Sequence, residues 1–142
     1  MSQVVSLRLP DDQAKRLKRQ ARRLGRTPSE TGRLLIEEAL RQIEFSHIEF
    51  RDSSAGRQAF VKGRRVQVWM LVMIAKGYAS DLKKTARHLE MPEEWVQSAF
   101  NYADAFPGEI RDAIEDNHKS FDELKHKLPS LERFTVSTRS RA

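Results

Sequence analysis

The chain has 142 residues, no cysteine, and 26 lysines and arginines against 20 aspartates and glutamates, which gives a net charge of +6. This length allows one domain of ordinary size or two small ones, and the lack of cysteine excludes disulfides and cysteine-based metal sites. The longest apolar run, Val68 to Ala75, is far shorter than the roughly 20 residues of a membrane span, and the N-terminal residues lack the pattern of a signal peptide. We therefore expect a soluble, cytoplasmic protein.

A strand is the first element that the sequence predicts. From Val4 to Leu9 the side chains alternate with the period of a strand, and Pro10 ends the alternation. One side of this strand is entirely apolar and the other is mixed. The two sets are Val5, Leu7 and Leu9 on the first side and Val4, Ser6 and Arg8 on the second.

Two helices are predicted to follow the strand. Apolar residues recur at spacings of three and four up to Leu24, and Gly25 is typical of a helix end. Thr27 then serves as an N-cap, with Pro28 at the first helical position and Glu30 three residues after the cap. The second helix extends to about Ile43.

One strand and two short helices cannot close a hydrophobic core. A lone strand leaves both of its edges without hydrogen-bond partners, and roughly 40 residues is near the lower limit for a single-chain domain. The simplest solution is a homodimer in which two N-terminal strands pair as an antiparallel ribbon. The all-apolar side of the ribbon then packs on four helices, and the mixed side faces outward.

Such a ribbon fits the major groove of double-stranded DNA. Arg8 suits the O6 and N7 acceptors of guanine, Ser6 can pair with several bases, and Val4 can contact a thymine methyl. The N-terminus of the second helix offers backbone N–H groups to a phosphate, and the hydroxyls of Thr27 and Ser29 lie there.

This stretch resembles the ribbon-helix-helix DNA-binding family, which includes Arc-, MetJ- and CopG-like repressors. The resemblance covers about the first third of the chain and implies that Val4, Ser6 and Arg8 read bases. Met1 to Ile43 hold ten basic and five acidic residues, whereas the rest of the chain holds sixteen and fifteen. This asymmetry indicates an anionic partner for the N-terminal part. The alternative is a dimerisation module without a DNA role, with the basic residues forming a solvated helix face.

A second pattern begins after a junction at Ser46 to Gly56. The junction itself holds a short predicted strand around Ile48 and Phe50. The pattern after it comprises a Lys62-Gly63 turn and an apolar, buried helix from Trp69 to near Gly77. Both tryptophans, Trp69 and Trp95, are expected in the core.

Asp81 to Leu89 and Pro92 to Ala105 are then spaced as a helix-turn-helix pair. Asp81 is expected to cap the first helix of this pair, and Pro92 suits the start of the second. The second helix of this pair is acidic and has no lysine or arginine, so phosphates would repel Glu93 and Glu94. A packed helical unit is favoured over a second DNA reader.

Residues Phe60 to Val68 carry a further resemblance, to a family catalogued as domain of unknown function 433. Its pattern is an apolar pair, a basic residue, glycine, any residue, arginine, an aliphatic residue, any residue and valine, with Arg65 at the arginine position. The match spans about Ile48 to Ile110. It implies a winged-helix-like unit and an antitoxin encoded beside a toxin with a PIN-type ribonuclease fold. Arg64 and Arg65 then either contact a partner or bond local carbonyls and carboxylates.

The C-terminal tail follows a short helix that is expected to begin at a capping Ser120 and to end at Pro129. Phe134 and Val136 are apolar residues in a polar terminal segment, and such segments order on a partner or remain frayed. The predicted domains are thus 1–44, 45–117 and the tail 118–142.

The sequence predicts a mainly α protein: a ribbon-helix-helix unit followed by a small winged-helix-like or helix-turn-helix-like domain with a short β element. No catalytic constellation, metal site or cofactor site is expected, because the histidines are scattered and the glycines isolated. The resemblances imply a homodimeric repressor that is the antitoxin of a type II toxin–antitoxin pair. The alternatives are a stand-alone regulator, whose second domain oligomerises or senses a ligand, and an architectural DNA-binding protein.

Overall fold

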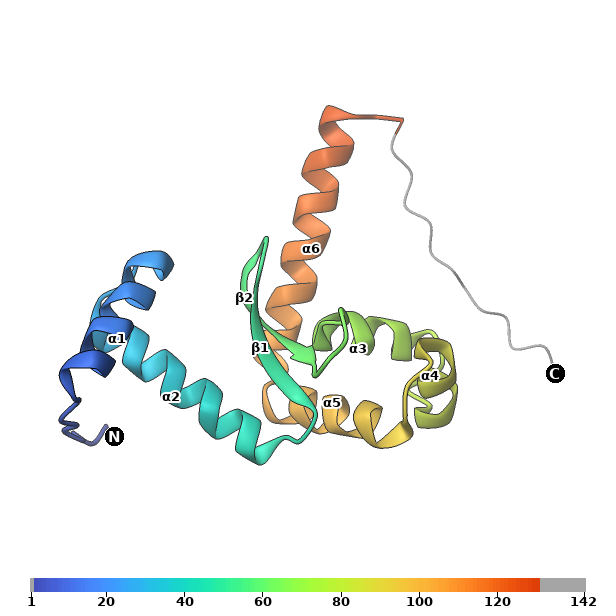
Figure 1. Ribbon diagram of the computed structural model, residues 1–142. Coiled ribbons are helices and arrows are strands. Elements are labelled where there is room, and N and C mark those ends of the chain that lie inside the picture. Colours follow the sequence, from blue (N-terminus) through green and yellow to red (C-terminus); the bar gives the residue numbers. More distant parts are fainter. Residues whose placement is uncertain (1, 131–142) are drawn as a thin grey trace. The chain divides into compact units, whose positions relative to one another are not determined.

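The computed structural model describes residues 2–130 and is mainly helical, with one two-stranded antiparallel sheet (Figure 1). The predicted mainly α class is confirmed. The chain divides into two compact units, Met1–Arg41 and Gln42–Ala142, which we call the N-terminal and C-terminal units. None of the helices in the described part of the chain has the length and apolar character needed to cross a membrane.

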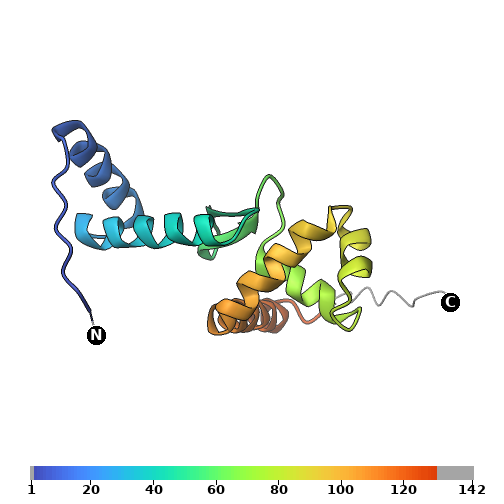
Figure 2. The same cartoon turned by 90° about the horizontal axis from the view of Figure 1, so that it is seen from below.

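The N-terminal unit begins with an extended segment, residues 2–10, and not with a strand (Figure 2). The prediction of an N-terminal strand is therefore wrong for the single chain. The physical reason is that strand hydrogen bonds need a neighbouring strand, and the described part of this unit offers none.

Helices α1 (Asp11–Leu24) and α2 (Pro28–Glu44) follow the extended segment. As predicted, α1 ends at Gly25, which takes a left-handed conformation with φ of 65°. The predicted capping box also forms: the N–H of Glu30 donates to Thr27 Oγ1 at 3.2 Å, and the N–H of Thr27 donates to Glu30 Oε2 at 3.3 Å.

The C-terminal unit begins with a hairpin of β1 (Ile48–Ser53) and β2 (Gly56–Val61). The strands pair antiparallel, with Ile48 opposite Val61 and Ser53 opposite Gly56. The predicted strand around Ile48 is thus confirmed. The hairpin precedes the helices of the unit in the sequence.

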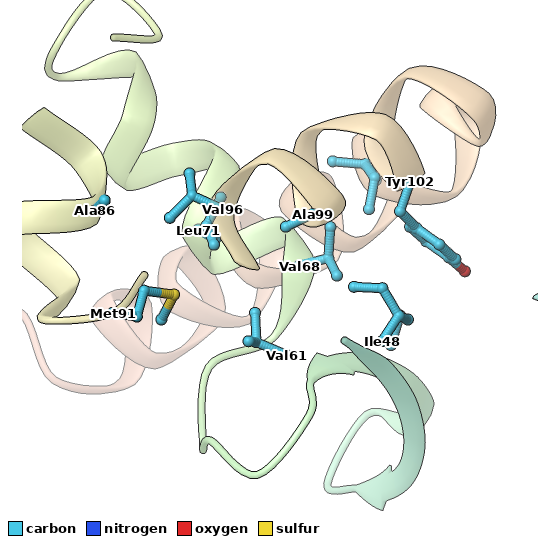
Figure 3. Close-up of a cluster of buried hydrophobic side chains, with 11 residues drawn as sticks. Ile48, Val61, Val68, Leu71, Ala86, Met91, Val96, Ala99 and Tyr102 are labelled. Carbon is cyan, nitrogen blue, oxygen red and sulfur yellow. The ribbon is translucent and has the colours of Figure 1, made fainter. Parts of the chain in front are cut away.

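Four helices complete the C-terminal unit: α3 (Val68–Lys76), α4 (Leu82–Leu89), α5 (Glu93–Ala105) and α6 (Pro107–Lys127). Side chains from the hairpin and all four helices form one hydrophobic core (Figure 3). Both tryptophans pack against this core, as expected. The fully buried members are Val61, Val68, Leu71, Val96, Ala99 and Tyr102.

Two local predictions for this unit need correction. Helix α3 is not buried on all sides, since Met70 is 36% exposed. Ser120 does not cap a separate helix, because α6 contains Ser120 in its interior. The helix also continues across residue 117, where the predicted second domain was expected to end. Pro107 at the start of α6 has no i−4 hydrogen bond to lose, so the long helix begins there.

Candidate nucleic-acid and partner interfaces

The N-terminal segment presents its apolar side chains to solvent. Val5 is 77% exposed, Leu7 is 65% exposed and Leu9 is 38% exposed, although all three are expected to be buried. The predicted base readers Val4, Ser6 and Arg8 are exposed as well. Exposed apolar surface of this kind in a small unit is a candidate interaction surface.

A groove of about 520 Å³ opens between this segment and the two helices of the N-terminal unit. Leu7 and Leu9 line it together with Leu17 of α1 and with Leu35 and Ile36 of α2. The described part of this unit has a single buried hydrophobic side chain, that of Ala21, which is 2% exposed. A core of this size cannot offset the conformational entropy of some 40 residues, at about 1–2 kcal/mol per residue for the backbone alone.

The exposed apolar surface of α2 was missed by the sequence reasoning. Four of its residues are large, apolar and at least 38% exposed. Their spacing in the sequence was the available signal, because apolar residues three or four apart share one helix face. They are Leu35, Ile36, Leu40 and Ile43.

The N-terminus of α2 is the predicted phosphate site. Thr27 and Ser29 are both exposed there. Glu30 already accepts the backbone N–H of Thr27, and its carboxylate places negative charge beside this helix end. Thr27 Oγ1 accepts the backbone N–H of Glu30, so the hydroxyl of Thr27 is already engaged in the capping box.

Arg64 and Arg65 differ in their contacts. Arg64 is half-buried, and its Nη2 and Nη1 atoms donate to the carbonyl oxygens of Leu89 at 2.6 Å and Glu90 at 3.1 Å. These carbonyls lie at the C-terminal end of α4, where Glu90 takes a left-handed conformation with φ of 52°. Arg64 therefore bonds local carbonyls, whereas Arg65 is exposed.

Arg51 supports the same turn and was not predicted from the sequence. Its Nη2 donates to the carbonyl oxygen of Arg64 and forms an ion pair with Glu49 Oε1 at 2.9 Å. Glu49 Oε1 also accepts the N–H of Gly63 at 3.2 Å. The guanidinium lies 4.3 Å from the ring centroid of Phe60. The alternation along β1, which puts Glu49 and Arg51 on one side of the strand, was the only signal.

Helices α4 and α5 form where the two helices of the predicted pair were expected, with a short turn between them. Asp81 caps α4 as expected, its Oδ1 accepting the N–H of Lys84 at 2.8 Å. Glu93 and Glu94 are exposed in the first turn of α5, and no basic residue lies on that helix. The surface that would enter a groove of DNA in a second reader is thus acidic.

The remaining predictions concern two residues of the C-terminal tail and the absence of a metal site. Phe134 and Val136 lie outside the described residues. Within residues 2–130, no three histidine, aspartate or glutamate side chains lie close enough to hold a metal ion. Comparison of the chain with protein-family models, with curated proteins and with solved structures gave no match.

Proposed function

We propose that the protein is a homodimeric DNA-binding repressor. The observation that carries this proposal is the row of exposed apolar side chains at Val5, Leu7 and Leu9, on a segment that pairs with no strand in the described part of the chain and lies beside an apolar groove. Antiparallel pairing of two such segments would give each backbone a hydrogen-bonding partner along one edge and would cover the row in one step.

The outward side of the paired segments would then carry the base-reading residues. Arg8 has the geometry for guanine, and Ser6 and Val4 add a polar and an apolar contact. Ser29 and Thr27 at the start of α2 would contact the phosphates on either side. The net charge of +5 on Met1 to Ile43, ten basic against five acidic residues, favours binding to a polyanion.

The C-terminal unit is proposed to bind a protein and not DNA. Residues 45–130 hold thirteen basic and thirteen acidic residues, so this part has no excess of positive charge. The acidic start of α5 would also meet the phosphates of a groove. Arg65 remains a candidate partner contact, whereas the bonds of Arg64 favour a structural role for that residue.

The resemblances to ribbon-helix-helix regulators and to domain of unknown function 433 extend this proposal to a type II toxin–antitoxin pair. The chain would then be the antitoxin, would neutralise a PIN-type ribonuclease and would repress its own operon. Co-expression with the product of a neighbouring gene tests this part. Rescue of growth by residues 1–44 alone would refute the assignment of the toxin to the C-terminal unit.

The DNA-reading role is tested by replacing Arg8 with alanine. We expect a loss of about ten- to hundredfold in affinity for the DNA upstream of the protein's own gene, because a bidentate arginine–guanine contact contributes about 1–3 kcal/mol. Affinity for a scrambled duplex of equal length should change much less. Both affinities are measured by fluorescence anisotropy at one salt concentration.

Arg65→Ala is the matched control, since it removes the same charge from an exposed position of the C-terminal unit. It should leave both DNA affinities unchanged. Equal losses on the two DNAs for Arg8→Ala would assign Arg8 to phosphate contact, and no loss on either would remove it from the interface.

A further inference from the structure

An apolar stripe runs along α6, and the core of its unit covers the start of this stripe but not its C-terminal end. At the start of the helix Ile110 is only 7% exposed, but Leu124 and Leu128 near its end are 47% and 52% exposed. In Figure 1 this end of α6 extends beyond the other helices of the C-terminal unit. The stripe follows alternating spacings of four and three residues, the spacing with which helices pack against each other. Its apolar members are Ile110, Ile114, Phe121, Leu124 and Leu128, and the polar Asn117 occupies the remaining position.

The stripe begins at a groove of about 300 Å³ between α3, α5 and α6. Val72, Ile110 and Ile114 contribute apolar lining to this groove. Its charged lining is balanced, with two basic and two acidic side chains, so the groove itself has no preference for either sign. Charge selectivity must therefore come from the rest of the stripe.

From residue 111 onward one edge of the stripe is basic, and the other edge carries a single lysine beside neutral residues. With 3.6 residues per turn, Arg111, His118 and Lys125 lie along one edge and Lys127 lies along the other. The carboxylates of this part of the helix lie at least about 120° from the centre of the stripe. They are Asp112, Glu115, Asp116, Asp122 and Glu123.

We propose that this stripe binds an amphipathic helix of another protein, one whose apolar face is flanked by acidic side chains. Oppositely charged residues at the edges of two packed helices determine which partner binds. The basic side chains beside this stripe would pair with carboxylates of the partner helix. Binding of an acidic amphipathic helix to this stripe does not depend on the proposed function. Only the identification of that helix as part of the toxin rests on the proposed function.

A second copy of the chain and the chain's own C-terminal residues fit this stripe less well. Antiparallel pairing of two α6 helices places the edge of Arg111, His118 and Lys125 against itself, and parallel pairing places it against Ala113 and Ser120. Neither arrangement brings a carboxylate to a basic edge. Residues 131–142 hold three arginines and one glutamate, so they too would add positive charge to positive charge.

Peptide binding to the full-length protein tests the proposal. The probe is a synthetic three-heptad helix with leucines at the core positions and glutamates at both edges, and its counterpart has lysines at the edges. We expect the glutamate peptide to bind at least about tenfold more tightly, because several opposite-charge pairs form at once, and the preference should shrink as salt rises. Fluorescence anisotropy measures both affinities.

Variants of α6 separate the stripe from its edges. Leu124→Glu should lower the affinity for the glutamate peptide at least about tenfold by placing a charge in the apolar contact. The double variant Lys125→Glu with Lys127→Glu should reverse the preference in favour of the lysine peptide. Lys119→Glu is the matched control, since it makes the same change on the opposite face of the helix and should retain the preference.

Four outcomes would overturn the proposal. Equal affinity for the two peptides, or no binding while circular dichroism shows intact helix content, would exclude charge-selected helix binding. Self-association beyond a dimer that Leu124→Glu abolishes would assign the stripe to a second copy. Peptide binding that appears only after removal of residues 131–142 would assign it to the chain's own end. DNA binding of Leu124→Glu, measured in parallel, should match the parent, so a failed peptide test remains distinct from a failure of the proposed repressor function.

Discussion

Replacing Arg64 and Arg65 one at a time with alanine tests whether the first of them has a structural role. The guanidinium of Arg64 makes two hydrogen bonds to the carbonyls of Leu89 and Glu90, whereas Arg65 is an exposed neighbour of the same charge. Hydrogen bonds that involve a charged group contribute about 1.5–3 kcal/mol in mutational series. Because one half-buried group makes both bonds, we expect Arg64→Ala to lower the free energy of unfolding by about 2 kcal/mol, near the middle of that range. Arg65→Ala should change it by less than about 0.5 kcal/mol.

Urea denaturation followed by tryptophan fluorescence is the appropriate assay. Both tryptophans, Trp69 and Trp95, belong to the C-terminal unit, so the signal of the full-length protein reports this unit. With a slope of about 2 kcal/mol per molar urea, the midpoint of Arg64→Ala should fall by about 1 M while the slope stays constant. Equal midpoints for the two variants would refute the structural role and return Arg64 to the candidate partner contacts.

Two further predictions concern the core and the proposed dimer. Leu71→Ala should lower the free energy of unfolding of the C-terminal unit by about 2–5 kcal/mol, because Leu71 is fully buried. Met70→Ala, at an exposed neighbouring position, should lower it far less. Tryptophan fluorescence measures both losses, and similar values for the two variants would contradict the core described above. Leu7→Asp should abolish dimerisation, because it places a charge in the shared core. Ser6→Asp introduces the same carboxylate on the outward side and should leave a dimer in sedimentation. A dimer that survives Leu7→Asp would exclude pairing through the N-terminal segment.

Patterns between residues a few positions apart predicted most of the helix starts and ends that form within a single chain. The capping box of Thr27 and Glu30, the helix end at Gly25 and the cap at Asp81 all form as expected, since each depends on residues three or four positions apart. Strand pairing is different in kind. The alternation from Val4 to Leu9 predicts which side chains lie on the same face of a strand. A strand also needs a second backbone to donate and accept its hydrogen bonds.

Contacts between distant segments were beyond the reach of sequence patterns. The sequence left the role of Arg64 open, because nothing local indicates that its guanidinium reaches carbonyls 25 and 26 residues further along the chain. The role of Arg51 depends on the same fold, since the Arg64 carbonyl that it bonds is brought close by the hairpin and the turn after it. The continuity of α6 was missed for the opposite reason. Ser120 fits the pattern of a cap, yet Pro107 had already started a helix that nothing interrupts.

The exposed apolar row of the N-terminal segment sets the order of events in the proposed repressor. In a single chain the residues proposed to read bases lie on a segment that is not a strand, so the reading surface does not exist before two chains meet. DNA binding would therefore follow dimerisation and would depend on the concentration of the chain more steeply than binding by a preformed monomer. The stripe on α6 belongs to the other unit and carries its own partner preference. A protein that occupies it would alter repression if it changed how much dimer is present or how two dimers meet on the DNA.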